Sequence, residues 1–185
     1  MEIFERALNF KWEIIAVYGP ADHSRSEDFL AELRAKVAAA QLPVGVGGDF
    51  NPIPSEEDKS NNLINFPRMQ MFNDYIADMG LRELDRVGAR FTWTNRHADP
   101  TRSVLDRVFA SPEWDIRCPL ASLRAITRIG SDHVPLLLSF ENSTDVIIQY
   151  EKPNRYARDK TIQHTGEFGM TRFGIPGMQE LPLLR

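Results

Sequence analysis

The stretch that most constrains the fold is residues 42–51, LPVGVGGDFN. Its apolar beginning predicts a buried strand that ends at a pair of glycines, and the prolines that follow prevent a strand or helix from continuing. Asp49 and Asn51 are therefore placed on a stiff turn at the carboxyl end of a buried strand, where open α/β proteins place their ligands. The alternative is a turn without function, because Gly, Asp and Asn are ordinary turn residues.

The segment before this stretch predicts a strand, a helix and a second strand in succession. Residues 12–18 are β-branched and aromatic and end at a Gly-Pro pair, which favours a central strand. A capping sequence begins at Ser24, and the helix that it starts is expected to run to about residue 40. This order predicts right-handed parallel pairing of the strands at 12–18 and 43–48, which would place Tyr18 next to Asp49.

The rest of the sequence predicts an α/β domain over residues 1–141 and a polar tail over residues 142–185. The tail lacks sustained periodicity and is expected to be largely disordered or loosely attached. Within the domain, strands at 81–87 and 90–94 are expected to form a hairpin around Gly88. The remaining predicted elements are a helix over 67–79, strands over 104–110, 120–129 and 135–140, and a short helix that begins at Pro112.

Charge and composition limit the classes of partner. The 185 residues carry a formal net charge of −4, which argues against a protein that coats nucleic acid through its overall field. Residues 86–128 nevertheless contain eight arginines and four acidic residues. Since arginine pairs well with phosphate, this region predicts a local basic surface; the alternative is a solvated face with ion pairs. No apolar run approaches the length of a membrane span, and a single cysteine, Cys118, favours a reducing compartment.

The candidate chemistry rests on polar residues that follow or interrupt the predicted strands: Tyr18, Asp49, Asn51, Asp106, Asp132 and His133. Carboxylate and amide oxygens suit Mg²⁺ or Mn²⁺. Asp106 lies in an apolar strand, where a carboxylate needs a partner, and His133 can supply one. The set matches phosphodiester hydrolysis, with Asp49 activating water and with Asn51 and His133 donating to the developing charge. The alternatives are an ordinary loop hydrogen bond for His133 and a neighbouring arginine as the partner of Asp106.

Five short motifs, taken in order, resemble a known family. They are VYGP at 17–20, GGDFN at 47–51, FTWTN at 91–95, LDRVF at 105–109 and SDH at 131–133. They resemble the endonuclease/exonuclease/phosphatase superfamily, and most of all the apurinic-type endonuclease domain of plant LINE-type (non-LTR) retrotransposons. The resemblance covers residues 10–141 and implies a partial four-layered α/β sandwich (DNase I-like) with mixed sheets. It also implies a divalent-metal-dependent phosphodiesterase that acts on DNA. The location is not fixed by the sequence; we expect an intracellular protein, which would work in the nucleus if it acts on DNA there.

The resemblance also implies roles for individual residues. Tyr18 would contact the scissile phosphate, and Asp49 would activate water with Asn51 beside it. Asp106 would orient His133. The metal would lie near Asp49 and Asp132, and the DNA-facing side would carry Trp93, Asn95, Arg96 and Arg102.

The sequence also departs from the family pattern. In the family, an N-terminal half precedes the VYGP strand and supplies an Asn and a Glu that hold the metal, whereas this sequence begins just before that strand. We therefore expect a truncated domain with an exposed apolar sheet face and a tendency to self-associate. Three functions are weighed: a retrotransposon-derived DNA endonuclease, a catalytically inactive remnant that at most binds nucleic acid or a protein, and an inositol-phosphate phosphatase or deadenylase. The motifs favour the retrotransposon group over the third.

Overall fold

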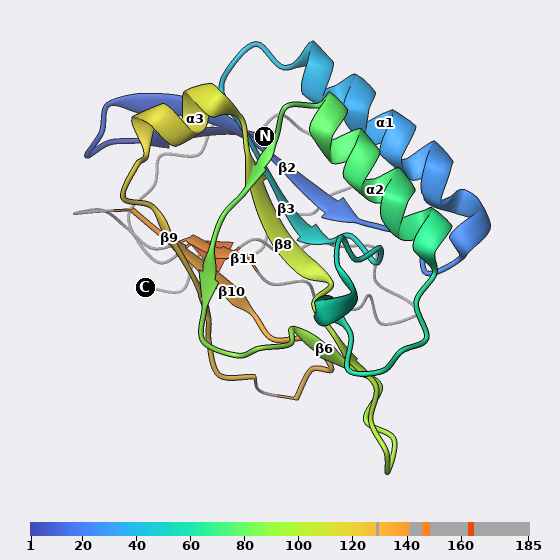
Figure 1. The fold of residues 1–185 in the computed structure, drawn as a ribbon. Coiled ribbons are helices and arrows are strands. Elements are labelled where there is room, and N and C mark those ends of the chain that lie inside the picture. The colour runs from blue at the N-terminus through green and yellow to red at the C-terminus, as the bar shows by residue number, and fades with distance from the viewer. Residues whose placement is uncertain (129, 141–145, 149–162, 165–185) are drawn as a thin grey trace, which may run out of the picture.

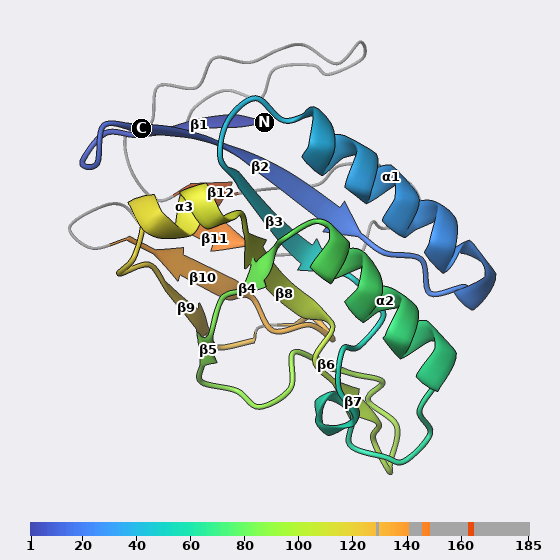
Figure 2. The same ribbon diagram turned by 45° about the horizontal axis from the view of Figure 1, so that its top comes forward.

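The structure is a computed structural model, and it describes residues 1–128, 130–140, 146–148 and 163–164. Two five-stranded sheets form its centre, and Figures 1 and 2 show helices α1 and α2 covering the outer face of one of them. The helices are α1 (Ser26–Ala39), α2 (Phe66–Asp78) and α3 (Pro112–Arg117), with 3-10 turns at His23–Arg25 and Glu56–Asp58. The layers are thus helix, sheet and sheet.

The first sheet has the strand order β1-β2-β3-β8-β4. Its strands are β1 (Glu2–Glu5), β2 (Phe10–Tyr18), β3 (Val44–Asp49), β4 (Arg82–Glu83) and β8 (Asp106–Ala110). The parallel pairing of β2 and β3 around α1 is confirmed, and it places Tyr18 opposite Asp49. β3 and β8 are antiparallel, with Asp49 opposite Asp106. This register brings two of the candidate carboxylates onto neighbouring strands.

The second sheet has the strand order β12-β11-β10-β9-β5, and two further strands form a small hairpin. The strands of the sheet are β5 (Arg86–Val87), β9 (Ser122–Ala125), β10 (Leu136–Ser139), β11 (Val146–Ile148) and β12 (Gln163–His164). The hairpin consists of β6 (Trp93–Thr94) and β7 (Arg102–Ser103). Each main sheet contains both parallel and antiparallel pairs, so the α/β class with mixed sheets that was predicted from the sequence is confirmed.

Two apolar cores hold these layers together. The core between the sheets includes the edge-to-face pair Trp12 and Trp114, whose ring centroids lie 5.6 Å apart. Gly45 makes room for Trp12, because a Cβ there would lie 2.8 Å from a carbon of the indole ring. The core under α1 and α2 contains Phe50, which packs edge-to-face on Phe109. Aromatic pairs of this kind add to the energy gained by burying apolar surface in both cores.

The predicted hairpin around Gly88 is wrong. β4 pairs with β8 in the first sheet, β5 pairs in parallel with β9 in the second, and β6 pairs with β7. The segment instead crosses between the sheets, and Leu84 is buried in the core between them. Gly88, with φ +103°, passes so near β9 that an added Cβ would lie 2.8 Å from the Ala125 carbonyl oxygen. Alternating residues identify strands, but they do not identify which strand lies beside which.

The outer face of the second sheet bears on the predicted self-association. On its described strands β9 and β10, this face carries Ser122 and Arg124, which are exposed, and Leu137 and Ser139, which are half-buried. This composition is mixed, and self-association stays a prediction. The predicted disordered tail lies outside the described residues, apart from β11 and β12. In the described part of the chain, no helix has the length and apolar character to cross a membrane.

Candidate active site

Asp49 ends β3 and is almost completely buried, with 2% of its surface exposed. Asn51 adopts a left-handed backbone with φ +66°, which Asn tolerates better than most residues. This turn lets the Asn51 backbone N–H donate to Asp49 Oδ1 at 2.9 Å, and its side-chain Nδ2 donate to Asp49 Oδ2 at 3.2 Å. The same Nδ2 donates to the Gly19 carbonyl oxygen at 2.7 Å. Asn51 thus fixes the carboxylate of Asp49 and ties it to the loop after β2.

Asp106 and His133 form the predicted pair. The Nδ1 atom of His133 lies 2.9 Å from Asp106 Oδ2 and 3.1 Å from Oδ1, and both side chains are buried. The other ring nitrogen, Nε2, lies 3.9 Å from Asp49 Oδ2. Arg107, the neighbouring arginine, pairs instead with Asp58 and Glu83. The histidine therefore lies between two carboxylates, with Asp106 fixing its orientation.

Thr92 connects the Asp106 strand to the His133 loop, and the sequence analysis did not single it out. Its fully buried hydroxyl accepts the backbone N–H groups of Leu105 and Asp106 at 2.9 and 3.0 Å. Its carbonyl oxygen accepts the N–H of Val134 at 2.7 Å. A threonine inside the FTWTN motif was the available signal, but only the tertiary structure shows what its hydroxyl contacts.

The electrostatics of the cluster follow from burying two carboxylates together. Burial, and then the charge of Asp106, raise the pKa of Asp49 from 3.8 to about 7. Burial by itself lowers the pKa of His133, but the hydrogen bond and charge of Asp106 and the charge of Asp49 outweigh it, so the His133 pKa is raised. A protonated imidazole between the carboxylates offsets only part of their charge, because the pKa of Asp49 stays well above its usual value despite His133. The site therefore holds a proton near neutral pH that it can exchange with a bound substrate.

Tyr18 and Asp132 lie beside this cluster. Tyr18 ends β2, is 39% exposed and stands opposite Asp49 in the sheet. Oδ2 of Asp132 accepts the indole N–H of Trp93 at 3.3 Å, and the charge of Asp132 contributes to the raised pKa of His133. The structure thus brings Tyr18, Asp49, Asn51, Asp106, Asp132 and His133 to neighbouring strand ends.

The four residues expected on the DNA-facing side belong to the β6–β7 hairpin and its tip, which projects from the body of the molecule in Figure 2. The Asn95 side-chain oxygen accepts the N–H groups of His97 and Thr101, so this amide shapes the tip. Arg96 donates from Nη2 to the Gly130 carbonyl oxygen at 2.7 Å, and Arg102 is exposed. Trp93 connects the hairpin to the cluster through Asp132.

With the geometry known, similarity to known proteins becomes informative. A model of the endonuclease/exonuclease/phosphatase family matches residues 5–133. The chain belongs to this family. A search of the curated proteins found no match.

Solved structures share the family fold at low sequence identity. A 3′ phosphatase, NExo, from Neisseria, bound to a product DNA hairpin, is 19% identical, with a TM-score of 0.55 over 71% of this chain and 61% of that one. The endonuclease domain of TRAS1, a telomere-specific non-LTR retrotransposon, is 17% identical, with a TM-score of 0.55 over 75% and 61%. A beta toxin from Staphylococcus aureus is 14% identical, with a TM-score of 0.53 over 75% and 55%. The chain thus matches between 55% and 61% of the length of these structures.

Members of this family are typically metal-dependent. Among the described residues, no group of three or more His, Cys, Asp or Glu side chains is arranged to hold a metal ion. Both carboxylate oxygens of Asp106 face His133, which leaves Asp49 as the carboxylate that a metal would use at this point. Asp49 and Asp132 therefore do not fit a complete metal site by themselves, and their role as ligands stays a prediction.

Replacing Asp49 with asparagine is expected to stabilise the metal-free protein. Since Asp49 ionises at pH 3.8 when unfolded and near 7 when folded, the folded state loses stability as pH rises between these values. Above pH 7 the folded protein bears the full free-energy cost of a buried, ionised Asp49, and a neutral asparagine amide avoids this cost. We expect Asp49→Asn to raise the free energy of unfolding by about 1–3 kcal/mol at pH 8.

Thermal unfolding in EDTA at pH 8 and at pH 4 measures this effect. The gain in melting temperature should be several degrees at pH 8 and should almost vanish at pH 4, where the wild-type carboxyl is protonated when folded. A variant that is less stable than wild type at both pH values would show that the charge of Asp49 is compensated in the folded state.

Proposed function

We propose that this chain is a divalent-metal-dependent phosphodiesterase of the retrotransposon-endonuclease type, which hydrolyses phosphodiester bonds in DNA. The observation that carries the proposal is the buried cluster of Asp49, Asp106 and His133, within a chain that belongs to the endonuclease/exonuclease/phosphatase family. A carboxylate with a pKa of about 7 facing a histidine suits proton transfer at neutral pH.

Each residue of the cluster has a step that its geometry supports. Asp49 accepts a proton from the attacking water, because its pKa lies near the working pH and Asn51 fixes its orientation. His133 donates a hydrogen bond from Nε2 to a non-bridging oxygen of the phosphate as charge develops there. As the water oxygen bonds to phosphorus, the bond from phosphorus to the leaving sugar oxygen breaks, and that oxygen takes up a proton from solvent. Asp106 positions the imidazole through Nδ1, and Tyr18, at the exposed end of β2, contacts the phosphate.

DNA is the substrate in this proposal for two reasons. The NExo structure is bound to a DNA hairpin, and the TRAS1 domain is an endonuclease. In the chain itself, the hairpin that projects beside the cluster carries Trp93, Asn95, Arg96 and Arg102, and exposed arginine pairs well with phosphate. The metal in the proposal is Mg²⁺ or Mn²⁺. Asp49 and Asp132 would hold the metal in this proposal, and further oxygen ligands would be needed, because these two residues do not complete a site among the described residues.

Nicking of supercoiled plasmid tests this function. We expect the purified, folded chain to convert supercoiled plasmid to the open circle with Mg²⁺ or Mn²⁺ and not with EDTA. Asp49→Asn, which we expect to fold well, should not nick. Nicking at the same rate by Asp49→Asn would contradict the role of Asp49, and binding of DNA without nicking by the wild type would favour an inactive nucleic-acid-binding protein.

A further inference from the structure

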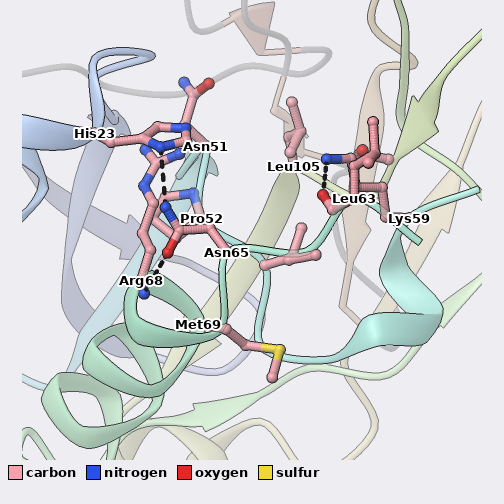
Figure 3. Close-up of a pocket in the computed structure, with 11 residues that line it drawn as sticks. His23, Asn51, Pro52, Lys59, Leu63, Asn65, Arg68, Met69 and Leu105 are labelled. Carbon is pink, nitrogen blue, oxygen red and sulfur yellow. Dashed lines mark hydrogen bonds between the residues drawn. The ribbon is translucent and has the colours of Figure 1, made fainter. Parts of the chain in front are cut away.

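A pocket lies directly beside the active site, and its lining is basic. It extends from Asn51 to the start of α2, as Figure 3 shows, with His23, Asn65 and Arg68 gathered on one side and Lys59 and Leu63 on the other. Among the described residues that line it, three carry basic side chains and none carries a carboxylate. Because Asn51 both lines the pocket and hydrogen-bonds Asp49, an occupant of the pocket would adjoin the reacting group.

Arg68 is the most rigid of these basic groups. Its Nε donates to the fully buried Ser26 Oγ at 2.8 Å, and its Nη2 donates to the Pro20 carbonyl oxygen at 2.7 Å. Nη1 has no hydrogen-bond partner among the described residues. No ion pair within the described part of the chain joins Arg68 to a carboxylate, although its charge interacts with that of Asp49 at longer range. Two hydrogen bonds thus fix the guanidinium of Arg68 while its Nη1 stays available, so the group is preorganised to bind an oxyanion.

His23 and Lys59 extend this basic lining. The side-chain oxygen of Asn65 accepts the Arg68 backbone N–H at 3.0 Å, so the amide nitrogen of Asn65 is the donor to His23 Nδ1 at 3.1 Å. The proton of a neutral His23 is therefore on Nε2, which makes that nitrogen a donor. Lys59 donates to the Leu63 carbonyl oxygen and retains further ammonium protons.

We infer that this pocket binds a backbone phosphate of the nucleic-acid strand adjacent to the scissile phosphate, with Arg68 as its main contact and Lys59 and His23 as supporting ones. The inference rests on the proposed function and adds a second contact point for the strand. An enzyme that holds a neighbouring phosphate in this way positions the scissile bond at Asp49. Phosphate contacts position a strand without reading its sequence, so binding at this pocket should not depend on which bases the strand carries.

The test is the salt dependence of DNA binding by the full chain in EDTA, which prevents cleavage. The probe is a fluorescein-labelled DNA duplex, titrated at several salt concentrations. Arg68→Gln should weaken binding roughly tenfold and reduce the slope of log K against log salt concentration by about 1. Arg68→Lys should keep the slope and lose part of the affinity, because it keeps the charge without the guanidinium fork.

Arg34→Gln is the matched control. Arg34 lies on α1, is half exposed, pairs with Asp78 and stacks over Tyr75, away from the pocket. Its replacement should leave both affinity and slope unchanged. Competition with inorganic phosphate is a second test. If millimolar phosphate displaces the duplex from wild type but not from Arg68→Gln, the pocket binds phosphate through Arg68. That result would also show that the pocket can bind a free phosphate ion as well as a phosphate of a DNA strand.

The outcomes separate this inference from the proposed function. If wild type binds and nicks DNA and a folded Arg68→Gln variant keeps the wild-type slope, the inference is overturned and the proposed function is not. If Arg68→Gln unfolds, Lys59→Gln decides, because it also removes a positive charge from the pocket, and an unchanged slope in that variant overturns the inference. Wild type that neither binds nor nicks DNA overturns the proposed function and the inference together.

Discussion

Replacing His133 with alanine is expected to lower the rate of plasmid nicking by at least about 10³-fold, because the substitution removes both the hydrogen-bond donor and the positive charge that would face the developing charge on the phosphate. The imidazole lies between Asp106 Oδ2, 2.9 Å from Nδ1, and Asp49 Oδ2, 3.9 Å from Nε2. Without it, two buried carboxylates on neighbouring strands face each other with no cation between them. The phosphate would then approach uncompensated negative charge, and binding as well as chemistry would suffer.

The role of Asp106 is separable from that of His133 by a double-mutant comparison. Asp106 acts through the imidazole, so Asp106→Asn should cost nicking activity in wild type and cost little more once His133 is alanine. Asp115→Asn, which removes an exposed carboxylate paired with Arg82, is the matched control and should nick normally. Fully additive losses at Asp106 and His133 would show that the two residues act independently, and single-turnover rates would measure this directly.

Replacing Gly48 with alanine is expected to destabilise the fold by more than about 3 kcal/mol, because two costs add at this position. Gly48 has φ +142°, a backbone conformation that side chains rarely allow. An added Cβ would also lie 2.1 Å from the Val17 carbonyl oxygen on the neighbouring strand. The backbone cannot yield here without breaking the β2–β3 pairing that aligns Tyr18 with Asp49.

Gly80 provides the matched control for this prediction. It also has a positive φ, +63°, but nothing lies within 4 Å of an added Cβ. Gly80→Ala should therefore cost only the backbone term, about 1 kcal/mol. Chemical denaturation of both variants measures the difference, and equal losses would show that the contact with Val17 is relieved by a small shift.

The sequence was sufficient to predict the parts of the site that depend on local patterns. An apolar strand that ends in Gly-Gly-Asp placed Asp49 correctly. A carboxylate inside an apolar strand showed that Asp106 needs a partner, but the sequence left His133 and a neighbouring arginine both open, and the structure shows that the partner is His133. In both cases the physical requirement is visible within a few residues. A buried charge needs a partner, and a strand that meets glycine pairs and prolines must end.

The sequence was insufficient where the partner lies far along the chain. Nothing near Leu84 indicates that its segment crosses between two sheets rather than folding back as a hairpin. The role of Thr92 depends on residues more than ten positions away, and that of Arg68 depends on Ser26, in a different helix. Tertiary contacts of this kind leave no periodic trace, so only the assembled structure shows them.

The position of Thr92 has a consequence for how the site would fail. One hydroxyl and one carbonyl of a single residue support both the strand that carries Asp106 and the loop that carries His133. Local opening of the segment around Thr92 would therefore disperse both members of the pair in one event, while the cores under the helices and between the sheets stayed folded. We therefore expect the Asp106–His133 pair to form a smaller cooperative unit than the domain, with a lifetime set by the opening of the FTWTN segment rather than by global unfolding.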